Sequence, residues 1–254
     1  MRPNHHKRYR SASHPHLDMF LLRVDIGIVE FHPWYNNVIQ PYIIFIRDNL
    51  LESIWSIVIV PCDQNGINLA LQKMRNGEVI VFPTDTVYGM GCDPFNKDAI
   101  NRIYELKGRD KTQYLPILGY SKKIVSEIAL FDQLSEKIAD RFWPGPLTLV
   151  LQVKDRKIAE SLDLGEKIAV RVPNHPCTLS LLKECKIIVG TSANHSGTPS
   201  FYDSKEIVKQ FSGYDLLLDG GIISGKGEST IVEVTGTEFK VLREGKIKSE
   251  DLLS

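Results

Sequence analysis

The sequence predicts one α/β or α+β domain with a mixed β-sheet, from about residue 57 to the end of the 254-residue chain. Short apolar runs rich in valine and isoleucine, typical of buried strands, alternate with segments whose apolar residues follow helical spacing. Strands and helices are therefore intermixed, and strands that follow one another directly near the end of the chain indicate a mixed sheet.

The expected strands are short β-branched runs bounded by turn residues. They cover residues 56–60, 78–82, 115–120, 147–153, 167–172, 186–190, 214–219, 229–234 and 239–244. For the segment that leads into the first of them, the pattern over residues 42–60 leaves helix and strand open.

Helices are expected between these strands, where apolar residues recur every three or four positions. They are a helix capped by Asp63 and closed by Asn76 and Gly77, a helix over residues 97–109, a helix over residues 135–143 capped by Ser135, a helix with Pro176 in its first turn, and a helix over residues 204–213. Pro144 stops the third of them because proline has no N–H to donate.

The composition is that of an ordinary globular protein, with 43% hydrophobic and 24% charged residues. The 31 basic residues balance 31 acidic residues, so no global field recruits nucleic acid or a membrane surface. No apolar segment reaches the length of about 20 residues that a membrane-spanning helix needs, and no export signal is recognised at the start. We therefore expect a cytoplasmic protein without a membrane partner.

The cysteines and the first residues carry no clear site. Cys62, Cys92, Cys177 and Cys185 contain no CxxC pair, which predicts reduced thiols rather than a zinc site or a disulfide framework. Four of the seven histidines lie within the first 16 residues, where several prolines interrupt any periodic pattern. We expect a poorly defined N-terminal extension over residues 1–55 and one folded domain over residues 56–254.

One glycine-rich segment imitates a phosphate-binding loop. GGIISGKG, residues 220–227, matches that motif up to Lys226, but Gly227 stands where serine or threonine should hold magnesium. A β-branched run follows instead of the helix whose N-terminus would bind phosphate. The segment is therefore predicted to be a connection between strands, and any nucleotide chemistry must use other residues.

Polar residues gather at the ends of several strands. PTDTVYGMG (residues 83–91) and TSANHSGTPS (residues 191–200) each follow a strand, and Arg171 interrupts the apolar strand IAVRV. Taken alone, KGRDK after the second helix is typical of a solvated face, and TSANHSGTPS is typical of a turn. Arg171 needs an anion or hydrogen-bond acceptors if it is buried. Together, these hydroxyls and cations favour an anionic ligand at the edge of an open sheet.

In sequence order, these segments resemble the YrdC/Sua5 family of threonylcarbamoyl-AMP synthases over about residues 57–250. The six matching motifs are PTDTVYGMG, KGRDK, WPGPLT, IAVRVP, GTSAN and ESTIVEV. The family's KxR and SxN pair stands here as Lys107 with Arg109 and Ser192 with Asn194. Each motif is common by itself, but their order along one chain is specific.

The resemblance implies an α/β fold with an open, twisted, mixed sheet, flanking helices and a concave basic cavity. It implies an L-threonylcarbamoyladenylate synthase, a nucleotidyltransferase that condenses L-threonine, bicarbonate and ATP and releases pyrophosphate. Mg²⁺ would enter with ATP, held by phosphate oxygens and water rather than by protein side chains. A separate complex would transfer the product to tRNA as the t6A modification.

Site residues follow from the resemblance by position. The threonine-binding residues would be Thr86, Tyr88, Arg171, Ser192 and Ser229, and the ATP-binding residues would be Lys107, Arg109, Ser192, Asn194, Ser200 and Arg243. Arg171 would pair with the threonine carboxylate, and no protein nucleophile is expected because Lys107 and Arg109 would act by charge stabilisation. Gly89 and Gly91 would let the backbone pass close to substrate.

The chain also departs from the family pattern. QYLP at residues 113–116 replaces a proline-leucine pair, no histidine stands near Leu118, and few residues follow Gly245. The chain therefore resembles a short, single-domain form. Two alternatives stay open: a paralogue of the same fold that binds nucleotide or double-stranded RNA without making the adenylate, and a carbamoyl-transfer module of the hydrogenase-maturation kind, whose zinc-finger cysteines this chain lacks.

Overall fold

Twelve strands form one mixed sheet in the computed structural model, which describes residues 42–47, 54–224 and 227–252. The strand order is β1-β2-β10-β3-β4-β9-β5-β8-β7-β11-β12, and β6 pairs with β7 beside this path. The strands are β1 (Tyr42–Arg47), β2 (Ile54–Pro61), β3 (Ile80–Pro83), β4 (Tyr88–Cys92), β5 (Ile117–Gly119), β6 (Ala129–Leu130), β7 (Leu147–Val153), β8 (Lys167–Arg171), β9 (Ile187–Ser192), β10 (Leu216–Asp219), β11 (Thr230–Thr235) and β12 (Glu238–Arg243). Parallel pairs such as β3 with β10 stand beside antiparallel pairs such as β3 with β4, which confirms the predicted mixed sheet.

The helices are α1 (Gln64–Arg75), α2 (Lys97–Lys107), α3 (Lys122–Ile128), α4 (Gln133–Phe142), α5 (Arg156–Ser161), α6 (Pro176–Cys185) and α7 (Ser204–Gln210), followed by a 3₁₀ turn, η1 (Ser249–Leu252). The carboxylate of Asp63 caps α1 as predicted, accepting a hydrogen bond from the N–H of Gly66 at 2.9 Å. The predicted cap of α4 is wrong. Asp132 is the N-cap, and Ser135 occupies the third helical position, where its hydroxyl accepts from the N–H of Asp132 in a capping box.

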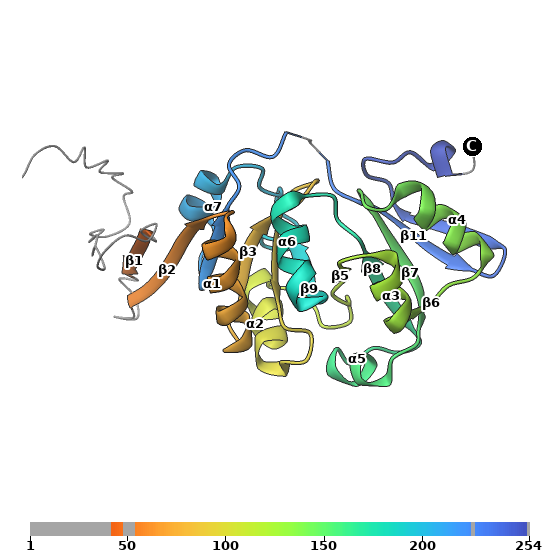
Figure 1. The fold of residues 1–254 in the computed structure, drawn as a ribbon, viewed down its shortest axis with the longest axis horizontal. Coiled ribbons are helices and arrows are strands. Elements are labelled where there is room, and N and C mark those ends of the chain that lie inside the picture. Colours follow the sequence, from red (N-terminus) through yellow and green to blue (C-terminus); the bar gives the residue numbers. More distant parts are fainter. Residues whose placement is uncertain (1–41, 48–53, 225–226, 253–254) are drawn as a thin grey trace, which may run out of the picture.

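The sheet is covered on both faces, so its strands carry apolar residues at consecutive positions. In β10, Leu216 and Leu218 pack with α1 and α6, whereas Leu217 belongs to the larger core on the opposite face. This alternation follows from the two-residue period of a strand. Figure 1 shows α1, α2 and α7 toward the β1 end of the sheet and α3, α4 and α5 toward the β11 end, with α6 between them.

The segment over residues 42–60, whose pattern left helix and strand open, contains strands β1 and β2. They pair antiparallel, and β2 joins the rest of the sheet through a parallel pairing with β10. The greater part of the predicted N-terminal extension, including its four histidines, lies outside the described residues. None of the described helices has the length and apolar character needed to span a bilayer.

The glycines of PTDTVYGMG do more for the sheet than the sequence indicated. Residues 88–92 form strand β4 rather than a substrate-facing loop. A Cβ on Gly91 would lie 2.0 Å from the carbonyl oxygen of Val189 on β9, so Gly91 is required by strand packing and not by substrate approach. Gly89 does line the pocket described below, although a Cβ there would also lie 3.0 Å from the ring of Phe82.

The prediction of four reduced thiols is wrong for two of the cysteines. Cys62, just after β2, and Cys177, in the first turn of α6, form a disulfide with a Cα–Cα distance of 5.5 Å, while Cys92 and Cys185 are free. The two partners are 115 residues apart in the chain, which is why spacing alone did not pair them. The bond ties α6 to the α1 side of the sheet.

Candidate functional site

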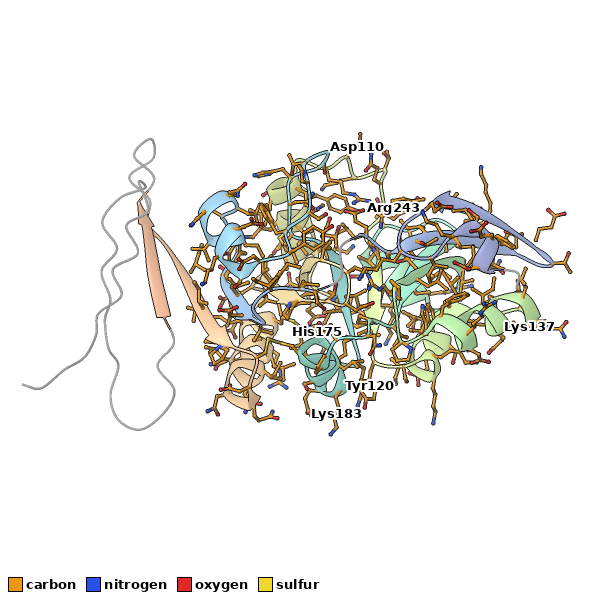
Figure 2. The ribbon with its side chains drawn as sticks, turned by 90° about the horizontal axis from the view of Figure 1, so that it is seen from above. Asp110, Tyr120, Lys137, His175, Lys183 and Arg243 are labelled. Atoms are coloured by element: carbon orange, nitrogen blue, oxygen red, sulfur yellow. A yellow bond between two sulfur atoms is a disulfide. The ribbon has the colours of Figure 1, made fainter. Side chains whose placement is uncertain are left out.

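A pocket of about 680 Å³, counting the space at its open mouth, lies among β4, β8, β9 and the C-terminal strands β11 and β12. Its lining includes six of the predicted site residues: Thr86, Arg109, Arg171, Ser192, Ser229 and Arg243. Figure 2 shows Arg243 on the same side of the molecule as Asp110, whereas Lys183 of α6 lies at the opposite edge.

The turn between β3 and β4 places two hydroxyls at the pocket. The Oγ1 of Thr84 donates to the carbonyl oxygen of Val87 at 2.6 Å and accepts from the N–H of Thr86 at 3.2 Å, so this hydroxyl shapes the turn. The two threonine Oγ1 atoms are 3.0 Å apart. The Thr84 oxygen also accepts from the N–H of Val87 at 3.2 Å, so both of its acceptor positions are used and the contact between the two hydroxyls has no fixed donor. Thr86 lines the pocket.

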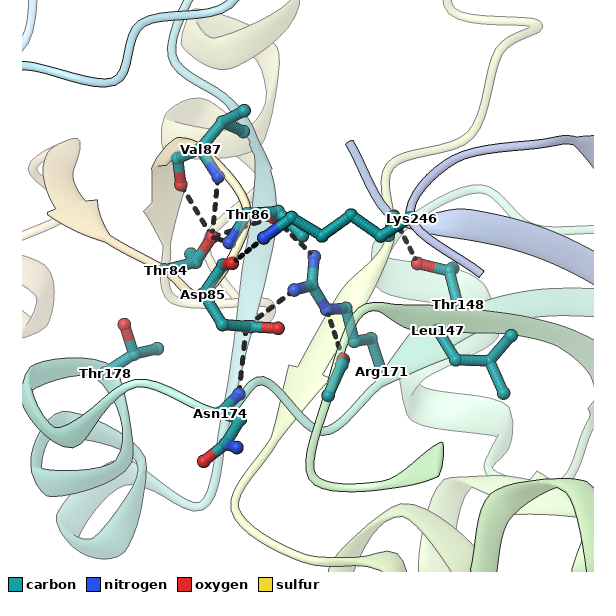
Figure 3. Close-up of polar contacts among 12 residues, drawn as sticks. Thr84, Asp85, Thr86, Val87, Leu147, Thr148, Arg171, Asn174, Thr178 and Lys246 are labelled. Atoms are coloured by element: carbon teal, nitrogen blue, oxygen red, sulfur yellow. Dashed lines mark hydrogen bonds and ion pairs between the residues drawn. The ribbon is translucent and has the colours of Figure 1, made fainter. Parts of the chain in front are cut away.

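Arg171, at the end of β8, is buried and fully engaged along one edge. Its guanidinium donates to the carbonyl oxygen of Gly145 at 3.0 Å, to Oγ1 of Thr86 at 3.0 Å and to Oδ1 of Asp85 at 2.6 Å (Figure 3). Burial lowers the pKa of Arg171, and the Asp85 carboxylate opposes this effect. Since three of five N–H donors are used, two remain for a ligand.

Lys107 and Arg109 do not share one face, as an extended KGR segment would require. Gly108 adopts a left-handed conformation at φ 56° and ends α2 between them. The ammonium of Lys107 donates to the carbonyl oxygens of Ser192 at 2.6 Å and Asn194 at 2.9 Å, and Lys107 does not belong to the pocket lining. The KxR and SxN motifs therefore meet through Lys107.

Burial, reinforced by the neighbouring Arg109, lowers the pKa of Lys107 to about 8. Arg109 itself lines the pocket, and its guanidinium donates to the carbonyl oxygens of Gln113 at 3.0 Å and Tyr114 at 3.2 Å. Burial also lowers the pKa of Arg109, and the charge of Arg243 adds to that effect. Two cations from distant parts of the chain thus face the same space.

The other end of the pocket is built around Arg243 and Glu228. They form an ion pair, and Arg243 also donates to the carbonyl oxygen of Ser229 at 2.9 Å. The hydroxyl of Ser229 is 3.0 Å from that of Thr148, and the hydroxyl of Ser200 donates to Glu228 at 2.6 Å. Ser200 therefore acts on the lining through Glu228.

Tyr88 lies outside the pocket lining. Its phenol donates to the carbonyl oxygen of Gly221 at 2.8 Å and accepts from the N–H of Gly220 at 3.0 Å, and burial raises its pKa to about 12. The side chain thus holds the glycine-rich connection after β10. That connection leads into strand β11 and not into a helix, which confirms the prediction that the segment connects two strands and is not a P-loop.

Several residues at or beside the pocket were not among the predicted site residues, among them Asp85, Thr148, Glu228 and Lys246. The first three lie within the motifs PTDTVYGMG, WPGPLT and ESTIVEV, so their position was a usable signal. Lys246 lies in no motif, and nothing local in the sequence marks it. All six motifs contribute at least one residue to the lining of the same pocket.

An open, mixed α/β sheet with arginines and hydroxyls around one pocket is the kind of site that suits an anionic small molecule. A sequence model of the Sua5/YciO/YrdC family, described as "Telomere recombination", matches residues 72–245. The chain therefore belongs to the Sua5/YciO/YrdC family, and its fold is the YrdC-like fold that the resemblance implied.

Relatives with an assigned activity are similar over most of this chain. The threonylcarbamoyl-AMP synthase of Pyrococcus abyssi is 35% identical over 201 residues, which make up 73% of this chain and 56% of that protein. The threonylcarbamoyl-AMP synthase of Bacillus subtilis is 35% identical over 189 residues, 72% of this chain and 54% of that protein. The chain thus spans little more than half the length of these two relatives.

A solved structure of P. abyssi Sua5 complexed with L-threonine superposes with a TM-score of 0.69 at 33% identity. The superposition covers 77% of this chain and 58% of that one.

Proposed function

We propose that this protein is an L-threonylcarbamoyladenylate synthase that condenses L-threonine, bicarbonate and ATP. The observation that carries the proposal is that six motifs, scattered over residues 83–234, all contribute to one pocket lined by cations and hydroxyls. Membership of the family and the L-threonine bound to the P. abyssi relative support the same assignment.

The reaction needs positioning and charge neutralisation more than a protein nucleophile. The amine of threonine attacks bicarbonate, which loses water and leaves an N-carboxylate, the carbamate. A carbamate oxygen then attacks the α-phosphorus of ATP, the bond to the β-phosphate oxygen breaks, and pyrophosphate leaves. Each step brings anions together, so arginines fixed around the pocket lower the barrier by holding the reactants and offsetting their charge.

In this proposal, the amino acid occupies the Arg171 end of the pocket. The two remaining donors of Arg171 bind the carboxylate, and the hydroxyl of Thr86 forms a hydrogen bond with the amine or the hydroxyl of threonine. ATP occupies the side of Arg109 and Arg243, whose guanidiniums face its phosphates. Ser192 and Ser229 also belong to the lining, and Ser229 contacts Arg243.

Lys107, Asn194 and Ser200 serve the nucleotide site from outside the lining. Lys107 holds the backbone of residues 192–194, and the amide of Asn194 donates to the carbonyl oxygen of Thr198 at 2.6 Å. Tyr88 serves threonine binding through the connection that it holds rather than by contact. These roles replace the direct contacts predicted for the four residues.

Mg²⁺ enters with ATP in this proposal, held by phosphate oxygens and water, as is usual for this ion. Within the described residues, no three acidic, histidine or cysteine side chains gather as a ligand set. Glu228 is a carboxylate in the pocket lining, and it is already bound to Arg243 and Ser200. The donor set therefore fits an ion that is brought by the nucleotide. When bound, the ion would neutralise phosphate charge.

The product would pass to a separate complex that transfers the threonylcarbamoyl group to tRNA, an activity that belongs in the cytoplasm. The test is pyrophosphate release from ATP, with threonine and bicarbonate omitted in turn. We expect release only when all three substrates are present. Equal release without threonine would refute the assignment, and salt-sensitive binding of double-stranded RNA without threonine-dependent release would support the paralogue alternative instead.

A further inference from the structure

Lys246 is a cation that the sequence did not predict; it lies outside the pocket lining, beside the Asp85–Arg171 pair. It follows β12, and its Nζ donates a hydrogen bond to the backbone oxygen of Asp85, 161 residues away in the chain. Figure 3 shows the side chain crossing from the C-terminal strands to the β3–β4 turn, close to the guanidinium of Arg171. The side chain thus spans one end of the site.

The backbone that carries Lys246 is held against β11. Its N–H donates to the carbonyl oxygen of Glu228 at 3.0 Å, and Oγ1 of Thr230 accepts from the N–H groups of Gly245 at 2.9 Å and Ile247 at 3.0 Å. A Cβ on Gly245 would lie 2.3 Å from the carbonyl oxygen of Glu228, so glycine is required for this close approach. The fixed backbone directs the Lys246 side chain toward the turn.

The charges at this end do not balance among themselves. Arg171 pairs with the carboxylate of Asp85, whereas Lys246 meets only the neutral backbone oxygen of the same residue in the described contacts. Burial lowers the pKa of Lys246, Asp85 raises it, and Arg171 lowers it, so the three charges interact. Two cations face one anion, which leaves one positive charge for a ligand to neutralise.

We infer that Lys246 and Arg171 together bind the carboxylate of the amino-acid substrate, so that Lys246 selects for a free carboxylate. This inference rests on the proposed function. Asp85 already balances the charge of Arg171, and three of that side chain's five donors are used within the protein. In the described contacts, Lys246 uses one of its three donors. Because Asp85 neutralises Arg171, the positive charge of Lys246 is the one left to pair with the substrate carboxylate.

The test compares L-threonine with L-threoninamide, which keeps the amine and the hydroxyl but replaces the carboxylate with a neutral amide. The KM for threonine is taken from pyrophosphate release, and the inhibition constant for threoninamide is taken from competition with threonine. Lys246→Met is expected to raise the KM for threonine by about tenfold to a hundredfold, which is the effect expected for the loss of a charge-assisted hydrogen bond. The inhibition constant for threoninamide should be nearly unchanged in Lys246→Met. Lys246→Arg should keep most of the affinity for threonine.

Lys248→Met is the matched control, because Lys248 is a cation in the same segment that pairs with Glu244 and not with the Asp85 turn. If Lys246→Met weakens the binding of threonine and of threoninamide equally, the inference is overturned, since Lys246 would then only hold the turn. An unchanged KM for threonine would also overturn it. If urea unfolding shows that Lys246→Met does not fold, Lys246→Gln is measured with the same ligand pair. A wild-type protein without threonine-dependent release would instead overturn the proposed function, and the inference with it.

Discussion

Both ends of the pocket contain an arginine–carboxylate pair, yet the two pairs differ in burial. The side chains of Arg171 and Asp85 are 7% and 14% exposed, whereas those of Arg243 and Glu228 are 43% and 34% exposed. Water cannot compensate for a lost partner at the buried end, so that pair is part of the structure. At the exposed end, solvent screens the pair, and Arg243 can exchange Glu228 for a phosphate at little cost.

The largest effect is expected at the buried end. Arg171→Ala leaves the Asp85 carboxylate without its partner and should lower the free energy of unfolding by about 3–5 kcal/mol. In protein that still folds, the KM for threonine should rise strongly and that for ATP much less. Urea unfolding and pyrophosphate kinetics measure both.

The double variant Arg171→Ala, Asp85→Ala should recover part of the lost stability, because it removes the unpaired charge. A single variant that unfolds like the wild type would show that the pair contributes nothing, and an unchanged threonine KM would remove Arg171 from the site.

The disulfide should matter next, because α6 supports the buried end from outside. The backbone N–H of Asn174, just before α6, donates to Oδ1 of Asp85 at 2.9 Å, and the hydroxyl of Thr178 in α6 donates to the carbonyl oxygen of Pro83. Cys62→Ser should lower the free energy of unfolding by about 2–4 kcal/mol, as expected for the loss of a bridge that closes a long loop. A reducing agent should destabilise the wild type equally, and Cys185→Ser, at a free cysteine, is the control. No effect of the reductant would mean that the purified protein holds two thiols.

The lowered pKa of Lys107 predicts that the free energy of unfolding depends on pH. Its pKa in the folded protein is about 8, below the ordinary value of 10.5, so between these values the unfolded chain binds more protons. The free energy of unfolding should therefore rise with pH over this window, and Lys107→Met should flatten the rise. Urea titrations from pH 7 to about 10 test the slope. A wild-type curve that falls over the same window would contradict the assignment.

The smallest effect on stability is expected from Arg243→Ala. Because its ion pair is exposed, the free energy of unfolding should change by less than about 1 kcal/mol. The KM for ATP should rise while that for threonine stays close to the wild-type value, which is the reverse of Arg171→Ala. Equal changes in both KM values would mean that the two ends do not divide the substrates as proposed.

Much of the fold could be predicted because its signals are local. Asp63 caps α1 where the apolar period begins, and the runs around Leu217 and Val81 alternate between two buried faces. The cap of α4 was misplaced because Ser135 and Asp132 both suit a helix start, and only the hydrogen bonds tell which one precedes the first turn. Gly91 was assigned to substrate approach because the pairing of β4 with β9, which demands it, joins residues about a hundred positions apart.

The sequence by itself determined most of the strands and helices and their order, though not β4, α3 or α5, together with the family and the presence of hydroxyls and arginines at strand ends. These follow from side-chain periodicity and from motifs that can be read along the chain. Only the tertiary structure decided that Arg171 pairs with Asp85, that Lys107 donates to the backbone of residues 192–194, and that Lys246 reaches the β3–β4 turn. Partners 85 to 161 residues apart meet through strand register and sheet order, which leave no local trace in the sequence.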